Sequence, residues 1–577
     1  MVFTAPVRSC SIRRSPSFCG RACITTRAKT KRPANRQPAS LFQYTSGRWV
    51  YNEKIRLQER YLKFNLPGLH SVIATATGHL ATDLVSFTKL SDGKSNRTFR
   101  ASFSDGQNVI AKLPYHCTIP KRYTVASEVA TMDYLRHNAI PTPKVYGYSS
   151  GTMNQVGTEY IVMEHMDGKP LSESWYTMTS DQQQRIMKQI VELETQMMSL
   201  KFPASGSIYY LDDIFQDRNI PLRDIGDRKF CVGPMVQPQY WEGQRALSDP
   251  RGRGPWTSPN HIFGDVGKRE LDWAKNYAKP RFPHNRAYRG IYAYRFVHPN
   301  EHIKNLTEYV ELSQYLGFSP RSPLYRHVFV HPDLQPSNIL VSKSHEVIGL
   351  IGFQHSAVLP LGLAAGFPKP FYNPGDLLSD MLVHPSSELP PNHESLSPTA
   401  LQEAREQYRR QRIHFLYASF TRQMNPHYFE AIFDDLAIMH RKLFHLANTP
   451  WVGDSVSLKA ELIDAINNWL PLTANDTPGN TWRLSTPPSL NYSPTEINEI
   501  MHALNRQQAV DAEITAIRER LGVAEDGWVS NENYESALKG IRQLKEKMLA
   551  DAKTREDRAD IESHFLFQDF SESGFKP

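Results

Sequence analysis

The stretch HPDLQPSNILV, which begins at His331, constrains the fold more than any other part of the chain. It sets an acid, Asp333, and a carboxamide, Asn338, on a loop between the apolar runs HVFV and ILV. At this spacing the acid can orient a substrate hydroxyl, and the carboxamide offers a neutral oxygen to a magnesium ion that bridges phosphates. The spacing predicts half of a phosphoryl-transfer site. A turn capped by Asp333 or Asn338 is the structural alternative.

A second metal carboxylate belongs at the end of the next apolar run, VIGLIGF, but that position is Gly352. Glycine has no side-chain oxygen, whereas Mg²⁺ usually takes one or two carboxylates together with phosphates and waters. Gln354 and Asp376 are the residues that could approach in its place. The sequence therefore predicts an incomplete metal site.

Three stretches upstream predict an antiparallel sheet over roughly residues 84–114. LVSFTKL, RTFRASF and NVIAKLP are rich in β-branched and aromatic residues, and Asp105-Gly106 between the last two is a strong hairpin signal. The loop KLSDGKSNRTF, which contains Ser95 and Asn96, lies where a flap over phosphates belongs. It has one glycine, Gly93, and read alone it is only a hairpin turn.

Lys112, in the third predicted strand, is a candidate to contact nucleotide phosphates. The helix that follows is indicated by Val125, Val129 and further apolar residues at spacings of three and four. Glu128 on this helix could pair with Lys112, although the periodicity does not decide its face. Each residue alone is also typical of a solvated surface position.

The remainder of the chain predicts a mainly helical region. A strand over EYIVME leads to a helix from Asp181, and further helices are expected at 401–424, 427–447 and 456–470. Residues 203–300 show no clean periodicity and predict ordered loops with short helices. The α+β order, strands before helices, predicts a small β-rich lobe over 46–165 and a larger helical lobe over 166–470.

Residues 471–577 predict a proline-rich linker and a charged helical extension over roughly 496–555. Its apolar positions, Leu538, Ile541, Leu544 and Met548, form a narrow stripe. Such a stripe suits docking on the large lobe or on a partner protein, and a solvated helix is the alternative.

The first 45 residues predict a mitochondrial presequence, with the matrix as the destination. Residues 1–52 contain ten Lys or Arg and no acid, and they are rich in Ser and Thr. A disordered basic tail is the alternative. Of the 67 basic residues, 57 remain after this segment, against 59 acids. The excess of basic over acidic residues is therefore confined to the N-terminal segment, and nucleic acid is not expected as a partner.

The cysteine positions and the hydropathy pattern argue against two further classes, disulfide- or zinc-stabilised proteins and membrane-spanning proteins. Cys10, Cys19 and Cys23 lie in the predicted presequence, which leaves Cys117 and Cys231 and no disulfide framework or zinc site. No uninterrupted apolar run reaches membrane-spanning length, so no transmembrane segment is expected.

Taken in order, these motifs resemble the aminoglycoside phosphotransferase-like (phosphotransferase enzyme) family, a branch of the protein-kinase-like fold. The resemblance covers residues 43 to about 470 and depends on the segments YTSGRWVYNEKIRLQERYLKFN, SNRTFRASFSDGQNVIAKLP, SGSIYYLDDI, RGPW and HPDLQPSNILV…GFQHSAVLPL. It implies a protein-kinase-like bilobal fold. It also implies ATP and Mg²⁺ as cofactors.

The resemblance assigns roles to individual residues. Asp333 corresponds to the catalytic acid, Asn338 to a metal ligand and Lys112 to the phosphate-contacting lysine, while the family pattern has an acid where this chain has Gly352. Two functions follow as alternatives. One is a phosphotransferase that acts on an unidentified small-molecule acceptor, and the other is a catalytically impaired protein that binds nucleotide or a protein partner.

Overall fold

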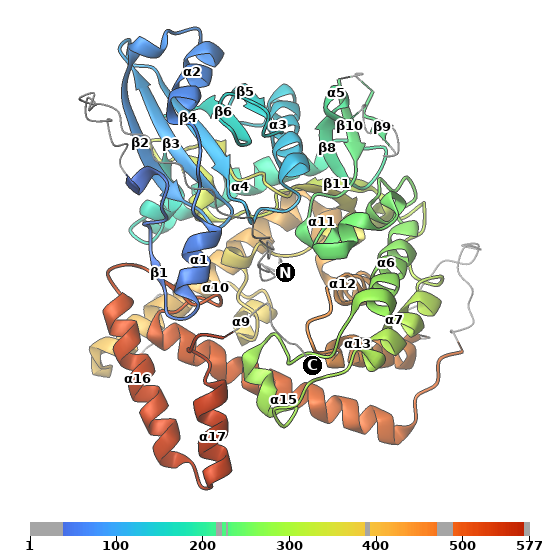
Figure 1. Ribbon diagram of the computed structural model, residues 1–577. Coiled ribbons are helices and arrows are strands. Elements are labelled where there is room, and N and C mark those ends of the chain that lie inside the picture. Colours follow the sequence, from blue (N-terminus) through green and yellow to red (C-terminus); the bar gives the residue numbers. More distant parts are fainter. Residues whose placement is uncertain (1–38, 215–221, 227–228, 387–392, 470–488, 571–577) are drawn as a thin grey trace, which may run out of the picture.

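The computed structural model describes residues 39–214, 222–226, 229–386, 393–469 and 489–570 (Figure 1). Most of the predicted presequence and of the proline-rich linker lies outside these residues. The described part divides into a small β-rich lobe, a larger helical lobe and a C-terminal helical region. This arrangement confirms the α+β, two-lobed prediction.

The small lobe is built on an antiparallel five-stranded sheet in the order β2-β3-β4-β6-β5. Its strands are β2 (Leu84–Asp92), β3 (Asn96–Phe103), β4 (Asn108–Pro114), β5 (Val145–Ser149) and β6 (Tyr160–Glu164). Along β3, buried and half-buried residues alternate, as expected for a strand with one face on a core. Helix α2 (Leu66–Thr77), which the sequence patterns did not reveal, covers that core with Leu69 and Ile73.

Helix α3 (Lys121–His137) lies between this sheet and a second, three-stranded sheet. The second sheet has the order β8-β10-β9, with β8 (Ser207–Tyr210), β10 (Phe230–Gly233) and β9 (Arg223–Asp224). Tyr210 and Lys229 hold the helix from this side, because the Tyr hydroxyl and the Lys ammonium each lie 2.7 Å from Asp133 Oδ2. Since α3 is buried on almost every face, apolar periodicity could not assign the face of Glu128.

The large lobe is a set of packed helices around a core shared with two short antiparallel sheets, one of two strands and one of three (Figure 1). The predicted helix from Asp181 is α4 (Ser180–Ser199), and those at 401–424 and 456–470 are α10 (Pro398–Met424) and α13 (Val456–Asn467). The predicted helix at 427–447 is divided into α11 (Pro426–Phe433) and α12 (Asp435–Ala447). The division falls at Asp434, whose carboxylate accepts from the Ala437 N–H at 2.7 Å and caps α12.

The prediction of ordered loops with short helices over 203–300 is confirmed for short elements such as α5 (Leu211–Ile214), but it missed a long helix. This region contains α6 (His261–Tyr277), which packs against α7 (Asn300–Leu312). Two charged residues, Arg269 and Glu270, lie on the buried side of α6, where Glu270 also accepts from Arg245 at 2.6 Å. Because these paired charges are buried, they interrupt the apolar periodicity from which a helix is predicted. The sequence pattern therefore did not indicate α6.

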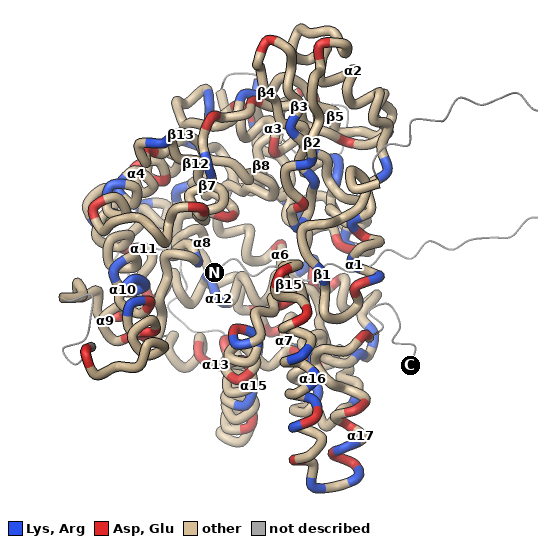
Figure 2. Tube along the Cα trace, turned by 90° about the vertical axis from the view of Figure 1, so that its left-hand side faces the viewer, with Lys and Arg blue, Asp and Glu red and all other residues tan. Residues whose placement is uncertain are grey.

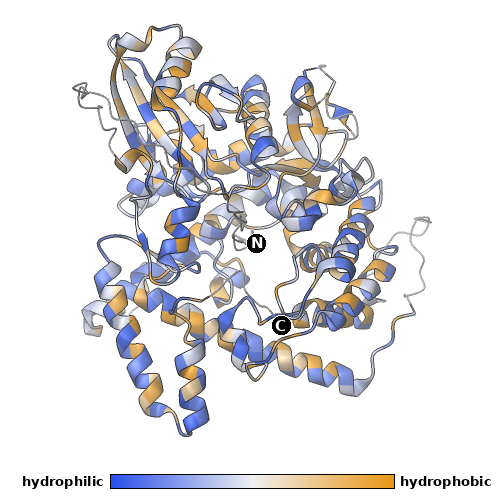
Figure 3. Cartoon of the chain, in the orientation of Figure 1, coloured by the Kyte–Doolittle hydropathy of each residue, from blue (hydrophilic) through white to orange (hydrophobic). Residues whose placement is uncertain are grey.

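The C-terminal helical region consists of α15 (Pro494–Leu521), α16 (Tyr534–Asp551) and α17 (Arg555–His564). The predicted continuous helix is interrupted after Leu521, where Gly522 caps α15 at φ +64°. In Figure 2 basic and acidic residues are mixed along these helices, and Figure 3 shows hydrophobic and hydrophilic segments alternating along α16. Leu538, Ile541 and Leu544 of the predicted stripe pack inside this region.

This region contacts both the N-terminal segment and the large lobe. The short strand β15 (Trp528–Val529) pairs with β1 (Arg48–Trp49), and Trp49 is 2% exposed. On the large-lobe side, Arg286 donates to the carbonyl oxygens of Leu566 at 2.8 Å and Gln568 at 2.7 Å. The C-terminal helical region therefore contacts both the large lobe and the N-terminal segment, but the predicted apolar stripe packs within the region itself and not on the large lobe. Among the described helices, none is long and apolar enough to cross a membrane.

Candidate active site

The loop from His331 lies between β11 (His327–Val330) and β12 (Ile339–Val341), as its flanking apolar runs predicted. The exposed Asp333 carboxylate is oriented through one oxygen: Oδ2 accepts from Gln335 Nε2 at 2.6 Å and from Asn338 Nδ2 at 3.1 Å. Its Oδ1 takes no hydrogen bond from a described residue. This oxygen is available to accept a proton from a hydroxyl that enters the site.

His331 connects the loop to the strand that follows it. Its Nδ1 accepts from the Asp333 N–H at 3.1 Å, so its Nε2 carries the proton and donates to the Ile351 carbonyl at 3.0 Å. Burial lowers the pKa of His331 to about 4, and the ring is therefore neutral at physiological pH. This neutral bridge fixes Asp333 relative to position 352.

Gly352 follows β13 (Val347–Leu350) in a left-handed conformation, with φ +88°. A Cβ atom built on it would lie 2.9 Å from Asn338 Cγ and 3.0 Å from Asn338 Oδ1. Asn338 cannot move freely, because its Nδ2 donates to the Asp333 carbonyl at 2.8 Å as well as to the carboxylate. The place where the missing carboxylate would begin is thus occupied by the Asn338 amide.

Asp376 does not replace the missing acid, contrary to one expectation. It caps the short helix α9 (Leu377–Asp380), where its Oδ1 accepts from the N–H and the hydroxyl of Ser379, each at 3.0 Å. Its Oδ2 accepts from Gln411 at 2.9 Å and Gln407 at 3.2 Å on α10. Partial burial raises its pKa, but these hydrogen bonds outweigh that effect and leave the pKa below its usual value. The carboxylate links α9 to α10, and both of its oxygens accept hydrogen bonds in this role.

Lys112 and Glu128 form the predicted pair. Lys112 Nζ lies 2.5 Å from Glu128 Oε1, and the two residues are 8% and 3% exposed. Lys112 is held in register by Thr98 on β3 and Ile161 on β6, so the sheet and α3 together fix the ammonium group. A buried and aligned ammonium is suited to contact phosphate oxygens.

The flap between β2 and β3 is a short, tight hairpin. The Gly93 N–H donates to the Asn96 carbonyl at 2.8 Å. The Ser95 carbonyl accepts from the Tyr115 N–H at 2.9 Å and from the Thr118 hydroxyl at 2.6 Å, and the Ser95 hydroxyl has no described partner. Asn96 Nδ2 donates to Gln354 Oε1 at 2.8 Å. Because Gln354 belongs to the large lobe, this bond joins the two lobes across the site.

His355 was not among the predicted site residues, and Gln354 was considered only as a replacement for the missing carboxylate, although they lie three and two residues after position 352. Gln354 Nε2 and His355 Nε2 are buried and have no hydrogen-bond partner among the described residues. Burial, and after it the charge of Lys112, lowers the pKa of His355 to about 4. The Asn96–Gln354 bond brings the loop between β2 and β3 next to the residues that follow position 352. Proximity in sequence to the acid loop is the signal that could have identified these two residues.

A protein-held magnesium ion does not fit this donor set. The loop supplies one carboxylate, from Asp333, and the Asn338 Oδ1 atom, and Gly352 adds no side-chain oxygen. In the described part of the chain, no group of three or more His, Cys, Asp or Glu residues could hold a metal ion. Near-octahedral oxygen coordination would have to come almost entirely from phosphates and water.

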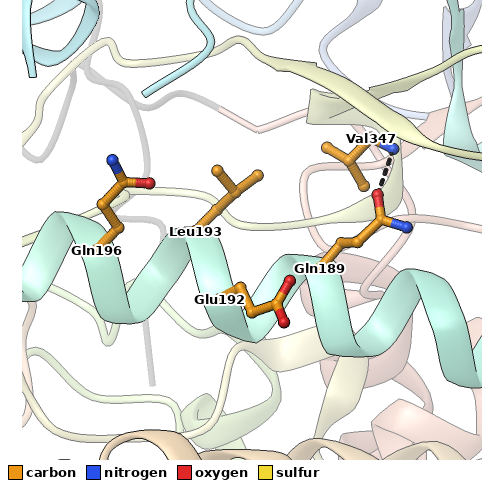
Figure 4. A pocket seen from close by; sticks show the side chains of 5 residues that line it. All are labelled: Gln189, Glu192, Leu193, Gln196 and Val347. Carbon is orange, nitrogen blue, oxygen red and sulfur yellow. Dashed lines mark hydrogen bonds between the residues drawn. The ribbon is translucent and has the colours of Figure 1, made fainter. Parts of the chain in front are cut away.

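Another concave region lies outside this site, between α4 and β13 (Figure 4). It is lined by Gln189, Glu192, Leu193, Gln196 and Val347. Gln189 Oε1 accepts from the Val347 N–H at 2.8 Å. This hydrogen bond joins α4 to β13 and so has a structural role. None of the lining residues is among the candidate site residues.

Comparison with known proteins also indicates a kinase-like phosphotransferase. Residues 86–261 match the family model described as phosphotransferase enzyme family. A subtelomeric hrmA-associated cluster protein of Aspergillus fumigatus is 27% identical, with 80% of this chain and 93% of that protein covered. The protein named altered inheritance of mitochondria protein 9, mitochondrial, from Yarrowia lipolytica is 21% identical, with 75% and 77% covered.

Solved structures with similarity include an ethanolamine kinase of Plasmodium vivax, with 12% identity and a TM-score of 0.33, covering 76% of this chain and 86% of that one. The apo form of a thermostable aminoglycoside phosphotransferase, APH(4)-Ia, has 10% identity and a TM-score of 0.30, covering 68% and 99%. Together with the family match, the two lobes and their strand order confirm the kinase-like fold.

Proposed function

Starting from a chain whose residues 86–261 match the phosphotransferase enzyme family, we propose that this protein is a mitochondrial kinase-like phosphotransferase. It binds ATP between its lobes and transfers the terminal phosphoryl group slowly to a hydroxyl or amine of a small molecule. The observation that carries this proposal is the convergence of the Lys112–Glu128 pair, the Asn96–Gln354 bond and the oriented Asp333 on one site.

Each residue has a separate task in this proposal. Lys112 neutralises phosphate charge, and Glu128 holds the ammonium in place. Asp333 accepts the acceptor's proton through Oδ1, while Gln335 and Asn338 keep its other oxygen engaged. Transfer is slow because Gly352 supplies no carboxylate to hold a charge-neutralising ion. A lost charged group of this kind costs on the order of 10²–10⁴ in rate.

The mitochondrial location is supported by the acid-free, basic N-terminus and by relatives whose names include the word mitochondrial. A fluorescent reporter fused behind residues 1–45 is expected to enter mitochondria and to reach the matrix. A reporter that stays in the cytosol would contradict this part of the proposal.

Asp333→Asn is expected to abolish transfer, with a loss of roughly 10²–10⁴-fold, because the amide cannot take the proton. ATP affinity should remain near the wild-type value, since Asp333 faces the acceptor. The measurement is release of the terminal phosphoryl group of ATP in the presence of a panel of amino alcohols and sugars, together with calorimetric ATP binding.

Asp181→Asn, at the exposed start of α4, is the matched control and should leave both quantities unchanged. Turnover by Asp333→Asn at more than a third of the wild-type rate would contradict the assignment of Asp333 as the base.

The second candidate is a catalytically impaired protein that uses the same fold to bind nucleotide or a protein partner. Gly352 is the observation that favours it, because the loop is built around glycine with the Asn338 amide in the adjacent space. Wild-type protein that binds ATP but transfers no phosphoryl group to any acceptor in the panel would select this candidate.

A further inference from the structure

The metal carboxylate cannot be restored at position 352 by a side chain alone. Gly352 adopts φ +88°, and any Cβ there meets the Asn338 amide at 2.9–3.0 Å. That amide donates to the carbonyl and to the carboxylate of Asp333, so moving it would leave the carboxylate oriented by Gln335 alone. The architecture around position 352 therefore disfavours a second carboxylate ligand, because a side chain there is strained and displaces Asn338. The phosphate charge must be balanced by other groups.

Gln354 lies two residues further on and reaches across to the small lobe. Its Oε1 accepts from Asn96 Nδ2 at 2.8 Å, which fixes the plane of the amide. Its Nε2 is then a fixed donor between the lobes, and it is buried with no acceptor among the described residues. A buried donor without a partner costs free energy unless a ligand supplies the acceptor.

Among the other groups at this place, Lys112 supplies a hydrogen-bonding ammonium. Its charge is offset by Glu128, and His355 is neutral. A triphosphate is a polyanion with many acceptor oxygens, so an ammonium and an amide N–H can both hydrogen-bond to it directly. This set of donors suits phosphate oxygens and does not suit a cation.

We propose that the site binds a nucleoside triphosphate without a divalent cation, with Lys112 and the Gln354 amide as direct donors to its phosphate oxygens. The proposal rests on the nucleotide-binding function proposed above and adds its metal independence. Gln354 thereby makes, as a neutral donor, part of the phosphate contact that a carboxylate-bound metal ion makes in the kinase-like family.

Calorimetric titration of the full chain with ATP, in EDTA and in excess Mg²⁺, tests this proposal. The two dissociation constants are expected to agree within roughly fivefold, a difference of about 1 kcal/mol. Binding in Mg²⁺ that is weakened more than fivefold by EDTA would overturn the metal independence while the proposed function stands. An absence of binding in both conditions would overturn the proposed function itself.

The variant Gln354→Glu tests the role of the Gln354 N–H as a donor to the nucleotide. The Glu carboxylate can still accept from Asn96, so the contact between the lobes is retained, but the N–H is replaced by a negative oxygen. ATP affinity in EDTA is expected to fall at least roughly tenfold, the size of one charge-assisted hydrogen bond. Gln189→Glu on α4 is the matched control, because its Oε1 is likewise an acceptor and it lies outside the site. Unchanged affinity in Gln354→Glu would refute the role of Gln354.

Gly352→Asp and Gly352→Ala test the exclusion of the carboxylate. Both are expected to lower the melting temperature to a similar extent, because both place a Cβ against Asn338 at positive φ. Neither should make ATP binding depend on Mg²⁺. If Gly352→Asp melts like the wild type and binds ATP at least roughly tenfold more tightly with Mg²⁺ than in EDTA, a metal site exists there and the proposal fails.

Discussion

Lys112→Met is expected to weaken ATP binding by roughly 10- to 150-fold, the equivalent of a charge-assisted hydrogen bond of about 1.5–3 kcal/mol. The variant should also be less stable by about 3–5 kcal/mol, because Glu128 is 3% exposed and would lose the ammonium with which it is paired. Calorimetric ATP binding and denaturant unfolding measure the two effects separately.

Two further variants separate function from stability. In Lys112→Met with Glu128→Leu the unpaired carboxylate is also removed, so stability should largely recover while ATP binding stays weak. Lys121→Met breaks another buried pair of the same lobe, in which Lys121 lies 2.7 Å from Glu159, and it should destabilise the protein without a specific loss of ATP affinity. Recovery of ATP binding in the double variant would show that Lys112 does not contact the nucleotide.

Ending the chain at Leu490 is expected to destabilise the fold by on the order of 5 kcal/mol or more, and most of the protein should be lost to aggregation. The C-terminal helical region covers Trp49, and Arg286 donates to the carbonyls of Leu566 and Gln568. Removal would expose a large aromatic surface and leave the buried Arg286 without those acceptors. Expression in the soluble fraction and thermal melting are the measurements.

A pair of substitutions on α16 tests the same packing without truncation. Ile541 is 6% exposed and Met548 is 37% exposed, and both belong to the predicted apolar stripe. Ile541→Ala is expected to cost about 2–5 kcal/mol. Met548→Ala should cost less than about 1 kcal/mol, because a surface side chain has little contact to lose. Equal effects would mean that Ile541 is not packed in the core of this region.

Local sequence determined the strands and the acid loop. Alternating residues in β3, the Asp105-Gly106 turn and the apolar runs on either side of His331 all act over a few neighbouring positions. The spacing of Asp333 and Asn338 likewise determined their hydrogen bond, because five residues on one tight loop return the amide to the acid. These features require no information about distant segments.

Tertiary structure decided the remaining features, because they depend on residues far apart in the chain. Helix α6 carries Arg269 and Glu270 on its buried side, a pattern that is stable only because Arg245 pairs with Glu270. Asp376, considered as a metal ligand from sequence, is used by Gln407 and Gln411 of α10.

The sequence showed only that position 352 has no carboxylate. That a carboxylate there would collide with Asn338, and that Gln354 presents an unpartnered amide N–H beside Asn96, follow from the packing of the two lobes. Residue identity limits which groups a site can contain, but hydrogen-bond partners and free space are set by segments that meet only when the chain has folded.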